Sequence, residues 1–336
     1  MDVQTPPSIA TAKRTTSSAL GWTMVLFALL WAAFYSLERW LPYLKNGSDV
    51  VFDAKLRWEQ EGQIFPADPR VTRVLIFGNS KILAGFLPEL FDQMSSEDHL
   101  NVSSFNSGFP GRDLFLPQLE AMCQRGQAPH ILLMTLPWTP DPPRRGIFHF
   151  VTDDHEVIDH LFPFRNLLRD LTAFLLSAPS HGGVLRYYRE SQANERQVIA
   201  ERGYHLITEQ SRFPGGRLPD DFHLGSDLPM QRDPRVAPAE STQIGRLNQL
   251  IRQYHMDCYY VPYYLRDGEA APAAEQDTAF AAQLQVTPCK LLGPDYYLYP
   301  NRLFADQTHL NEGGARVYTQ ALFQLLKDRL TPHALQ

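Results

Sequence analysis

Three residues that lie far apart in the chain have the types that nucleophilic catalysis by serine requires. Ser80 lies in Gly78-Asn79-Ser80-Lys81, whereas Asp306 and His309 lie in Asp306-Gln307-Thr308-His309-Leu310-Asn311 near the end of the chain. A carboxylate three residues before a histidine can reach its imidazole and fix the tautomer, which leaves the second ring nitrogen to deprotonate a serine hydroxyl. This combination predicts chemistry through an acyl-serine.

Each half of this pattern also has a simpler explanation. Ser80 is a residue type favoured as a helix N-cap, and His309 in a lone Asp-x-x-His is often a surface or capping histidine. The order favours the catalytic explanation, because the serine follows the first predicted strand and the Asp-x-x-His precedes the last predicted helix. Gly78 permits a tight turn between the first strand and Ser80. N–H groups at the start of the helix that follows can receive a developing oxyanion.

The elements that must position these residues alternate between strand and helix. Short segments at 74–77, 102–105, 131–134, 258–262 and 290–292 are predicted to be strands, and the first of them, Val74-Leu75-Ile76-Phe77, is an unbroken apolar run. Apolar residues at helical spacing predict helices at 82–94, 114–125, 242–255, 273–285 and 312–330. Unbroken apolar runs are typical of parallel strands buried on both faces. We therefore expect a three-layer α/β fold with a parallel sheet, and chemistry beyond the carboxyl ends of its strands.

The alternation is interrupted between residues 139 and 240. This stretch is rich in proline and contains two helix-like segments, 158–176 and 183–202. We expect it to be a large, mostly helical insertion within a domain that spans residues 71–336. Residues 38–70 are expected to form a juxtamembrane segment with one short helix at 52–61.

Residues 15–37 contain no charged side chain. A helix of about 20 residues crosses a hydrocarbon core of about 30 Å, so this segment is long enough to span a membrane. Trp22 near one end and Tyr35 and Trp40 near the other suit the aromatic belts at the two interfaces. We expect an uncleaved transmembrane anchor, with a cleaved signal peptide and a buried core helix as the alternatives.

The charges that flank this segment indicate its orientation. Lys13 and Arg14 come directly before it, whereas Arg39 and Lys45 follow it, so the count of positive charges is nearly balanced. The short tail with two adjacent basic residues is typical of a signal anchor. We therefore expect residues 1–37 to form a cytoplasmic tail and anchor in the cytoplasmic membrane, and the remaining chain to be extracytoplasmic.

Charge and cysteine content exclude several classes of protein. The formal net charge of −6, from 31 Lys+Arg and 37 Asp+Glu, argues against a nucleic-acid binder. Cys123, Cys258 and Cys289 form no CxxC motif, and three cysteines allow at most one disulfide, whose pairing the spacing does not indicate. The His- and Asp-rich stretch 149–160 lacks the spacing of metal ligands on one helical face. We expect no metal and no cofactor.

Three motifs together resemble conserved blocks of a known superfamily. Gly78-Asn79-Ser80, Asn106-Ser107-Gly108 and the 306–311 motif resemble blocks one, two and five of the SGNH (GDSL-type) hydrolases. The resemblance covers residues 71–136 and 242–330, and the insertion lies outside it. It implies a flavodoxin-like sheet and an acyl-enzyme mechanism.

The resemblance also implies a role for each residue. Ser80 would be the nucleophile, His309 the general base and then the general acid, and Asp306 the carboxylate that orients the imidazole. The backbone N–H groups of Ser80 and Gly108 would form the oxyanion hole.

The chain departs from the family pattern at two places. Asn79 stands where the first block commonly has aspartate, which related membrane-associated groups tolerate. The third block usually supplies an asparagine as a further oxyanion donor, but residues 135–141 contain none. Loss of one such donor typically costs 10²–10³ in rate, unless Thr135, Thr139 or a residue of the insertion substitutes for it.

With the predicted anchor, the pattern is similar to membrane-anchored SGNH-like proteins of bacterial cell-surface polymer acylation. That similarity implies a serine esterase or O-acyltransferase that acts on an acyl ester or polysaccharide beside a membrane-bound O-acyltransferase partner. Two alternatives remain. One is an SGNH-fold scaffold or polymer-binding partner with weak or no catalysis. The other is a flavodoxin-like nucleotide binder, which the lack of a glycine-rich phosphate loop after the first strand disfavours.

Overall fold

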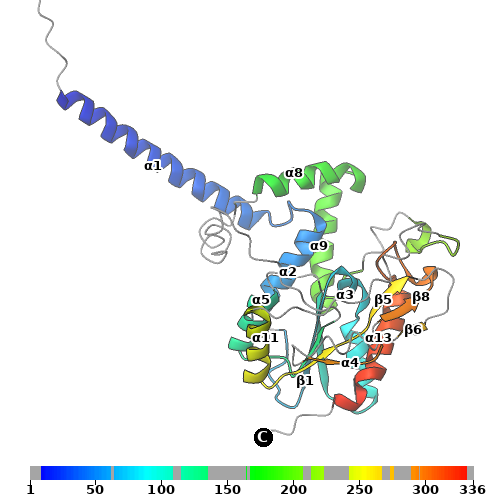
Figure 1. Cartoon of the computed structure of the whole chain (residues 1–336). Helices are drawn as coiled ribbons and strands as arrows, with labels where there is room; N and C mark the ends of the chain where they lie inside the picture. The colour runs from blue at the N-terminus through cyan, green and yellow to red at the C-terminus, as the bar shows by residue number, and fades with distance from the viewer. Residues whose placement is uncertain are drawn as a thin grey trace, which may run out of the picture. The chain divides into compact units, whose positions relative to one another are not determined.

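The computed structural model describes residues 9–61, 64–108, 115–134, 164, 167–206, 213–222, 242–266, 273–275, 289–294 and 296–330. The chain forms two compact units, and Figure 1 labels many of their helices and strands. The N-terminal unit comprises residues 1–50 and 143–191, and the sheet unit comprises residues 51–142 and 192–336. The predicted insertion is therefore divided between the two units.

The sheet unit is built on a five-stranded parallel sheet with the order β2-β1-β3-β4-β7. Its strands are β1 (Thr72–Gly78), β2 (Val102–Gly108), β3 (Ile131–Met134), β4 (Asp257–Tyr260) and β7 (Lys290–Leu291). Numbered along the chain, this is the order 2-1-3-4-5, one of the two common orders of doubly wound α/β sheets. The predicted α/β fold with a parallel sheet is confirmed.

Helices cover both faces of this sheet. They are α3 (Ser80–Gly85), α4 (Pro88–Glu97), α5 (Phe115–Gln124), α11 (Thr242–Gln253), α13 (Glu312–Leu326) and the short turn η8 (Lys327–Arg329). Ile76 and Leu133 pack against α3, α4 and α13, whereas Leu75 and Leu132 pack against α5 and α11. Because successive strand residues point to opposite faces, an apolar run buries both faces at once.

The predicted helix at 82–94 is wrong, because the structure has two helices there. The chain is extended at Leu87, directly before Pro88, which is the first residue of α4. Proline disfavours helical backbone in the residue before it, so the helix ends before Leu87. The freed N–H of Leu87 donates to Oγ1 of Thr319 in α13 at 3.0 Å, which ties the break to the C-terminal helix.

A second sheet of three strands, in the order β5-β8-β6, was not predicted. Its strands are β5 (Tyr263–Arg266), β6 (Ala273–Glu275) and β8 (Tyr296–Tyr299), of which β6 pairs with β8 antiparallel. The prediction of a helix at 273–285 is wrong at its start, where β6 lies, and 276–285 lies outside the described residues. Strand pairing here overrides the helix propensity of alanine.

One disulfide joins two neighbouring strands of the five-stranded sheet. Cys258 lies in β4, and its partner Cys289 directly precedes β7. Cys123 in α5 is a buried free thiol. The bond therefore fastens the short edge strand β7 to the sheet.

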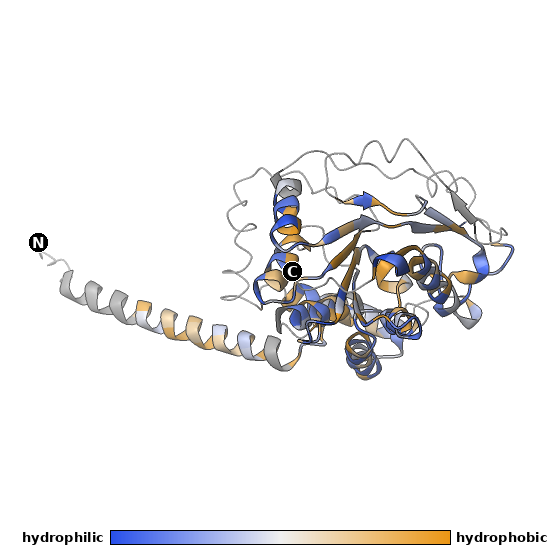
Figure 2. Ribbon diagram, turned by 90° about the horizontal axis from the view of Figure 1, so that it is seen from below, coloured by the Kyte–Doolittle hydropathy of each residue, from blue (hydrophilic) through white to orange (hydrophobic). Residues whose placement is uncertain are grey.

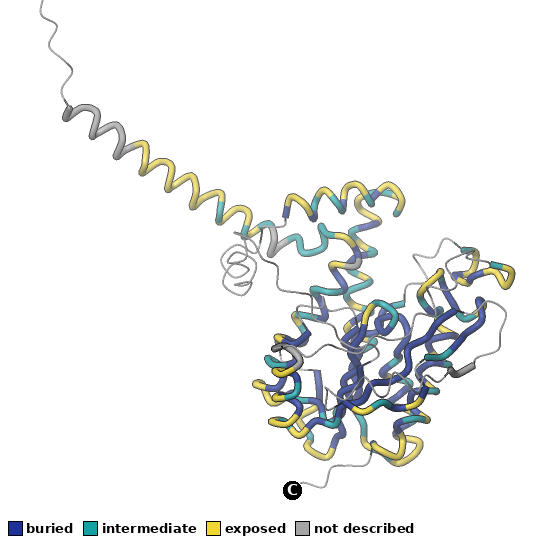
Figure 3. The backbone as a smooth tube through the Cα atoms, in the orientation of Figure 1, coloured by how far each residue is buried: buried dark blue, intermediate teal, exposed yellow. Residues whose placement is uncertain are grey.

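The N-terminal unit contains the apolar segment. Helix α1 (Ile9–Trp40) includes Ala19–Leu37, which is long and apolar enough to cross a membrane. Its described residues are mostly hydrophobic and exposed (Figures 2 and 3). The other helices with residues in this unit are α2 (Gly47–Glu61), α8 (Leu167–Ser177), η2 (Ala178–His181) and α9 (Val184–Ala200).

The N-terminal unit has a small core of its own. The ring of Tyr187 in α9 stacks on Phe174 of α8 at 4.8 Å between centroids, and its hydroxyl accepts a hydrogen bond from the N–H of Gly47. The helices predicted at 158–176 and 183–202 correspond to α8 and α9, although most of 158–166 lies outside the described residues. The short juxtamembrane helix, predicted at 52–61, begins earlier, at Gly47.

Reduction of the Cys258–Cys289 disulfide is expected to lower the free energy of unfolding by about 2–4 kcal/mol, since the bond closes a loop in the unfolded chain. Urea titrations of the full chain in detergent, with and without reductant, measure this effect. A Cys258→Ser/Cys289→Ser double variant should unfold at the same urea concentration under both conditions. A wild-type midpoint that does not respond to reductant would contradict the prediction.

Candidate active site

The structure brings Ser80, His309 and Asp306 together. Oγ of Ser80 lies 2.9 Å from Nε2 of His309, and Nδ1 of His309 lies 2.8 Å from Oδ2 of Asp306. With its proton on Nδ1, the imidazole donates to the carboxylate and accepts from the serine hydroxyl. This is the nucleophile, base and orienting group arrangement that serine catalysis needs.

The sheet and a short helix position Ser80. β1 is flanked by β2 and β3, and Ser80 is the first residue of α3 directly beyond its carboxyl end. The side chain of Asn79 caps α3 by accepting a hydrogen bond from the N–H of Lys81 at 2.9 Å. No described residue accepts a hydrogen bond from the N–H of Ser80. Among the described residues, that donor is therefore available beside the Ser80 hydroxyl.

A tight turn before α13 positions Asp306 and His309. The N–H of Ala305 donates to the carbonyl of His309 at 2.8 Å, and Phe304 pairs with Leu310 in an antiparallel bridge. Asn311 then caps α13 with its side chain. These contacts close the turn on both sides of His309, so its ring is held by backbone geometry as well as by Asp306.

Hydrogen bonds keep Asp306 ionised. Its Oδ1 accepts from the N–H groups of Thr308 and His309, both at 2.7 Å, while Oδ2 faces the imidazole. Burial by itself raises the pKa of Asp306, but the hydrogen bond and charge interaction with His309 and the two backbone donors outweigh it. The pKa of Asp306 therefore lies below its ordinary value. A carboxylate in this state stabilises a protonated imidazole.

Asn106 fastens the end of β2 to the helix that carries Ser80. Its side chain is fully buried, and Nδ2 donates to the carbonyls of Ile82 at 2.7 Å and Phe86 at 2.8 Å. The sequence analysis named Asn106 only as part of a motif and predicted no role for it. An asparagine between apolar strand residues was the available signal, because a buried amide must find hydrogen-bond partners.

The N–H of Gly108, predicted as an oxyanion donor, has a hydrogen-bond partner within the protein. It donates to Oδ1 of Asn106 at 2.8 Å. A Cβ at Gly108 would lie 2.3 Å from the backbone nitrogen of Leu83, so only glycine permits this close approach. The structure thus places Gly108 against α3, while its role as an oxyanion donor stays a prediction.

Two buried ionisable residues of α2 hold the same strand end. Nζ of Lys55 donates to the carbonyls of Gly108 at 2.6 Å and Gly203 at 3.1 Å, and the hydroxyl of Ser107 donates to Glu59 at 2.9 Å. Burial lowers the pKa of Lys55 and raises that of Glu59, while the attraction between the two opposes both shifts. The sequence analysis missed this pair because it treated residues 38–70 as a segment outside the catalytic domain.

Lys81, the neighbour of Ser80, is held by Tyr264 of β5. Its Nζ donates to the carbonyl of Tyr264 at 3.0 Å, and the hydroxyl of Tyr264 donates back to the carbonyl of Lys81 at 2.8 Å. Burial lowers the pKa of Lys81 to about 8. A Cβ at Gly85 would meet the Tyr264 ring at 2.8 Å, so α3 packs closely on this ring.

Other predicted site residues lie outside the described part of the chain. They are Thr135 and Thr139, predicted as possible substitute oxyanion donors; the His- and Asp-rich stretch 149–160, which was not predicted to bind a metal, also lies outside the described residues. Among the described residues, no group of three or more His, Cys, Asp or Glu side chains could hold a metal ion.

Comparison of the chain with protein-family models, with curated proteins and with solved structures finds no match. The chemistry of the site is therefore argued from the geometry of this chain's own residues. Three of those residues, Ser80, Asp306 and His309, were named from the sequence, and the structure brings all three into hydrogen-bond contact.

Asn106→Asp is expected to lower the free energy of unfolding by at least about 3 kcal/mol. A carboxylate oxygen would replace the donating Nδ2 and would face the carbonyls of Ile82 and Phe86, to which it cannot donate. Urea titration at pH 7 measures the effect. Asn101→Asp, at an exposed position next to the same strand, is the control and should change stability by about 0.5 kcal/mol or less. Equal midpoints for the two variants would contradict the role given to Asn106.

His205 is a buried histidine close to Lys55. Its backbone N–H donates to the carbonyl of Leu83 at 3.1 Å, and its Nδ1 is buried without a hydrogen-bond partner. Burial, and next the charge of Lys55, lower the pKa of His205 to about 4. The imidazole is therefore neutral in the folded protein down to acidic pH.

Acidification from pH 7 to pH 5 is expected to cost about 2 kcal/mol of stability through His205, because the unfolded chain binds the proton first. The loss begins as the pH falls below the ordinary histidine pKa and ends near the folded value of about 4. Urea midpoints at pH 7 and pH 5 measure it.

The His205→Gln variant should lose this part of the pH dependence, whereas the exposed control His99→Asn should keep it. The readout is the difference between two pH values within each variant, so a uniform destabilisation does not affect it. The same pH dependence in wild type and His205→Gln would show that His205 is not the group responsible.

Proposed function

We propose that this protein is a membrane-anchored serine esterase or O-acyltransferase that acts through an acyl-serine on a cell-surface glycan or related polymer. The observation that carries the proposal is the continuous set of hydrogen bonds from Ser80 through His309 to Asp306. The sheet order supports a flavodoxin-like, SGNH hydrolase-like fold, since the nucleophile lies beyond the carboxyl end of a strand where the strand order reverses.

The first half of the reaction transfers an acyl group to the enzyme. Oγ of Ser80 attacks the carbonyl carbon of the ester while its proton passes to Nε2 of His309. The imidazolium, stabilised by ionised Asp306, then gives this proton to the leaving alcohol as the ester bond breaks. The acyl group remains on Oγ as an ester.

The second half releases the acyl group. Water or a sugar hydroxyl loses its proton to Nε2 of His309 as its oxygen attacks the acyl-serine. The bond to Oγ breaks, Ser80 regains its proton, and the product is a carboxylic acid or a new ester. Whether the enzyme hydrolyses or transfers therefore depends on which acceptor reaches the acyl-serine.

The oxyanion donors bear on the rate. The N–H of Ser80 is available, whereas that of Gly108 donates to Asn106. A missing donor typically costs 10²–10³ in rate, so a slow reaction of the acyl-serine with water is expected. The same observation favours a second candidate function, an SGNH-fold scaffold or polymer-binding partner in a membrane acylation complex.

The remaining features support a place outside the cytoplasm. The apolar segment Ala19–Leu37 is exposed, as a helix in lipid would be. Disulfides such as Cys258–Cys289 persist in exported proteins and are rare in the cytosol. The proposed arrangement is a single-pass anchor in the cytoplasmic membrane, an extracytoplasmic sheet unit, and a membrane-bound O-acyltransferase as partner.

Incubation of the full chain in lipid nanodiscs with p-nitrophenyl acetate is expected to add one acetyl group to the intact mass. Ser80→Ala should abolish the adduct because the nucleophile is gone, and His309→Ala should slow its formation by at least about 10²-fold because the base is gone. Ser96→Ala, at an exposed serine of α4, should behave as wild type.

Persistence of the adduct in water would favour transfer over hydrolysis. An adduct that forms equally in Ser80→Ala would contradict the assignment of the nucleophile. No adduct and no turnover in the wild type would favour the scaffold function.

A further inference from the structure

Helix α8 of the N-terminal unit exposes a row of leucines. Leu168 is 71%, Leu175 48% and Leu176 77% exposed. With Thr172 they are spaced as residues on one face of a helix. The opposite face, which includes Leu167 and Phe174, is buried, so the helix is held with its leucine row outward.

The leucine row carries no polar group that requires water. The hydroxyl of Thr172 in its middle donates to the carbonyl of Leu168 at 2.7 Å. The charged side chains of α8 are Arg169 and Asp170, which pair with each other at 2.9 Å. Asp170 is buried, and the exposed Arg169 is long enough to keep its charge in a polar layer while its stem lies on an apolar one.

The next helix also exposes apolar side chains at its start. Val184 and Leu185, the first residues of α9, are 51% and 63% exposed. An exposed apolar surface of this kind usually marks a site of interaction with a protein or a membrane. We call Leu168, Leu175, Leu176, Val184 and Leu185 the leucine surface.

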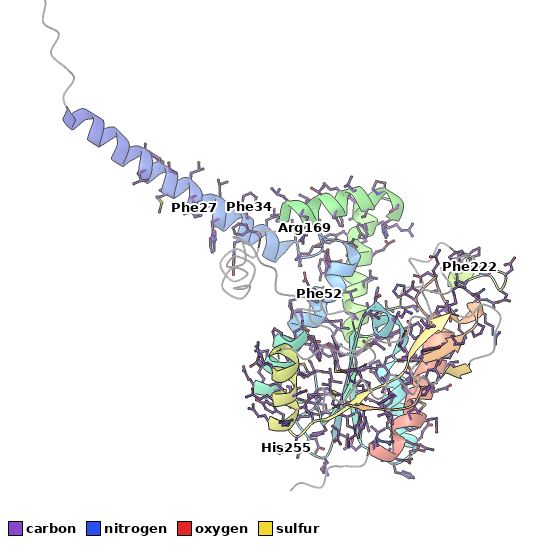
Figure 4. The ribbon with its side chains drawn as sticks, viewed as in Figure 1. Phe27, Phe34, Phe52, Arg169, Phe222 and His255 are labelled. Carbon is purple, nitrogen blue, oxygen red and sulfur yellow. A yellow bond between two sulfur atoms is a disulfide. The ribbon has the colours of Figure 1, made fainter. Side chains whose placement is uncertain are left out.

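An aromatic contact joins the chain just before α8 to the apolar segment of α1. Phe164, three residues before α8, contacts Trp31 at 6.3 Å and Phe34 at 5.7 Å between ring centroids. Trp31 also stacks on Tyr35. Figure 4 labels Phe34 on α1 and Arg169 on α8.

This contact indicates how deep the start of α8 lies relative to the apolar segment of α1. Phe34 and Trp31 lie about 5 and 9 Å before the end of the Ala19–Leu37 segment along the helix axis, at 1.5 Å per residue. Three residues reach at most about 11 Å, so α8 begins close to the end of that segment. Tryptophan and tyrosine at this level are typical of the boundary between hydrocarbon and headgroups.

We propose that the leucine surface lies on the lipid bilayer beside the membrane-spanning α1. The proposal rests on the proposed membrane anchor and extends it to a second point of attachment. Continuity with the aromatic contact at the end of α1 favours lipid over a protein partner, since any surface at this depth meets the bilayer first. Amphipathic helices with an apolar face and arginine at its border bind membranes in this way.

Nitroxide labels on the full chain in nanodiscs that hold one chain each test the proposal. Single cysteines are introduced at exposed positions, Leu168→Cys and Leu176→Cys on α8, Leu30→Cys within the α1 segment, and Ser96→Cys on the sheet unit. The parent chain, whose free Cys123 is buried, provides the background. Collision rates with oxygen and with a water-soluble nickel chelate report lipid and water at each label.

The proposal expects the α8 labels to show the lipid pattern, high oxygen and low nickel collision, as Leu30→Cys does, and Ser96→Cys to show the reverse. Nickel collision at both α8 labels equal to that at Ser96→Cys, with Leu30→Cys in lipid, would overturn the proposal and leave the anchor intact. A water pattern at Leu30→Cys itself would overturn the anchor and the proposal together.

A protein occupant would give a third pattern. Labels on α8 that are shielded from both oxygen and nickel, with dipolar broadening when discs hold two chains, would show that a second copy covers the surface. That result would also overturn the proposal.

Discussion

The hydrogen bond between Oγ of Ser80 and Nε2 of His309 joins residues that are 229 positions apart. It forms only because the fold of the sheet unit brings these two distant segments together. β1 delivers the serine to the carboxyl edge of the sheet, and α13 delivers the turn that carries the histidine. A hydrogen bond connects α13 to the break between α3 and α4, because the N–H of Leu87 donates to the side chain of Thr319. Proline at position 88 is thus part of the site's geometry, since it creates the break to which α13 binds.

Buried polar side chains hold the end of β2 next to Ser80. Such side chains lower the stability of the fold unless they form hydrogen bonds. The side-chain amide of Asn106 donates to a carbonyl of α3 and accepts from the N–H of Gly108. Lys55 donates to the carbonyl of the same glycine. Both groups would destabilise an apolar core without these partners. Their presence fixes the end of β2 against the helix that carries Ser80.

Much of this was predictable from local patterns. The alternation of short strand-like segments with helical patterns located all five strands of the main sheet, and the spacing of Asp306 and His309 named two of the three hydrogen-bonded residues. Features that depend on distant pairing escaped prediction. The second sheet forms only when β5 and β8, each containing two adjacent tyrosines, meet, and the alanine-rich β6 then joins β8 against its helical propensity. Lys55 and Asn106 likewise acquire roles only from partners that the sequence does not place beside them.

The central claim is that Ser80 is activated by the His309–Asp306 pair. The most direct test is the rate at which a fluorophosphonate labels the full chain, with the modified residue identified by mass spectrometry, in wild type and in Asp306→Asn. Asparagine preserves the size of the side chain but favours the wrong imidazole tautomer, and the exposed Asp328→Asn is the control. The account predicts labelling at Ser80 that Asp306→Asn slows by at least about 10²-fold and Asp328→Asn leaves unchanged. Absence of labelling at Ser80, or equal rates in wild type and Asp306→Asn, would contradict it.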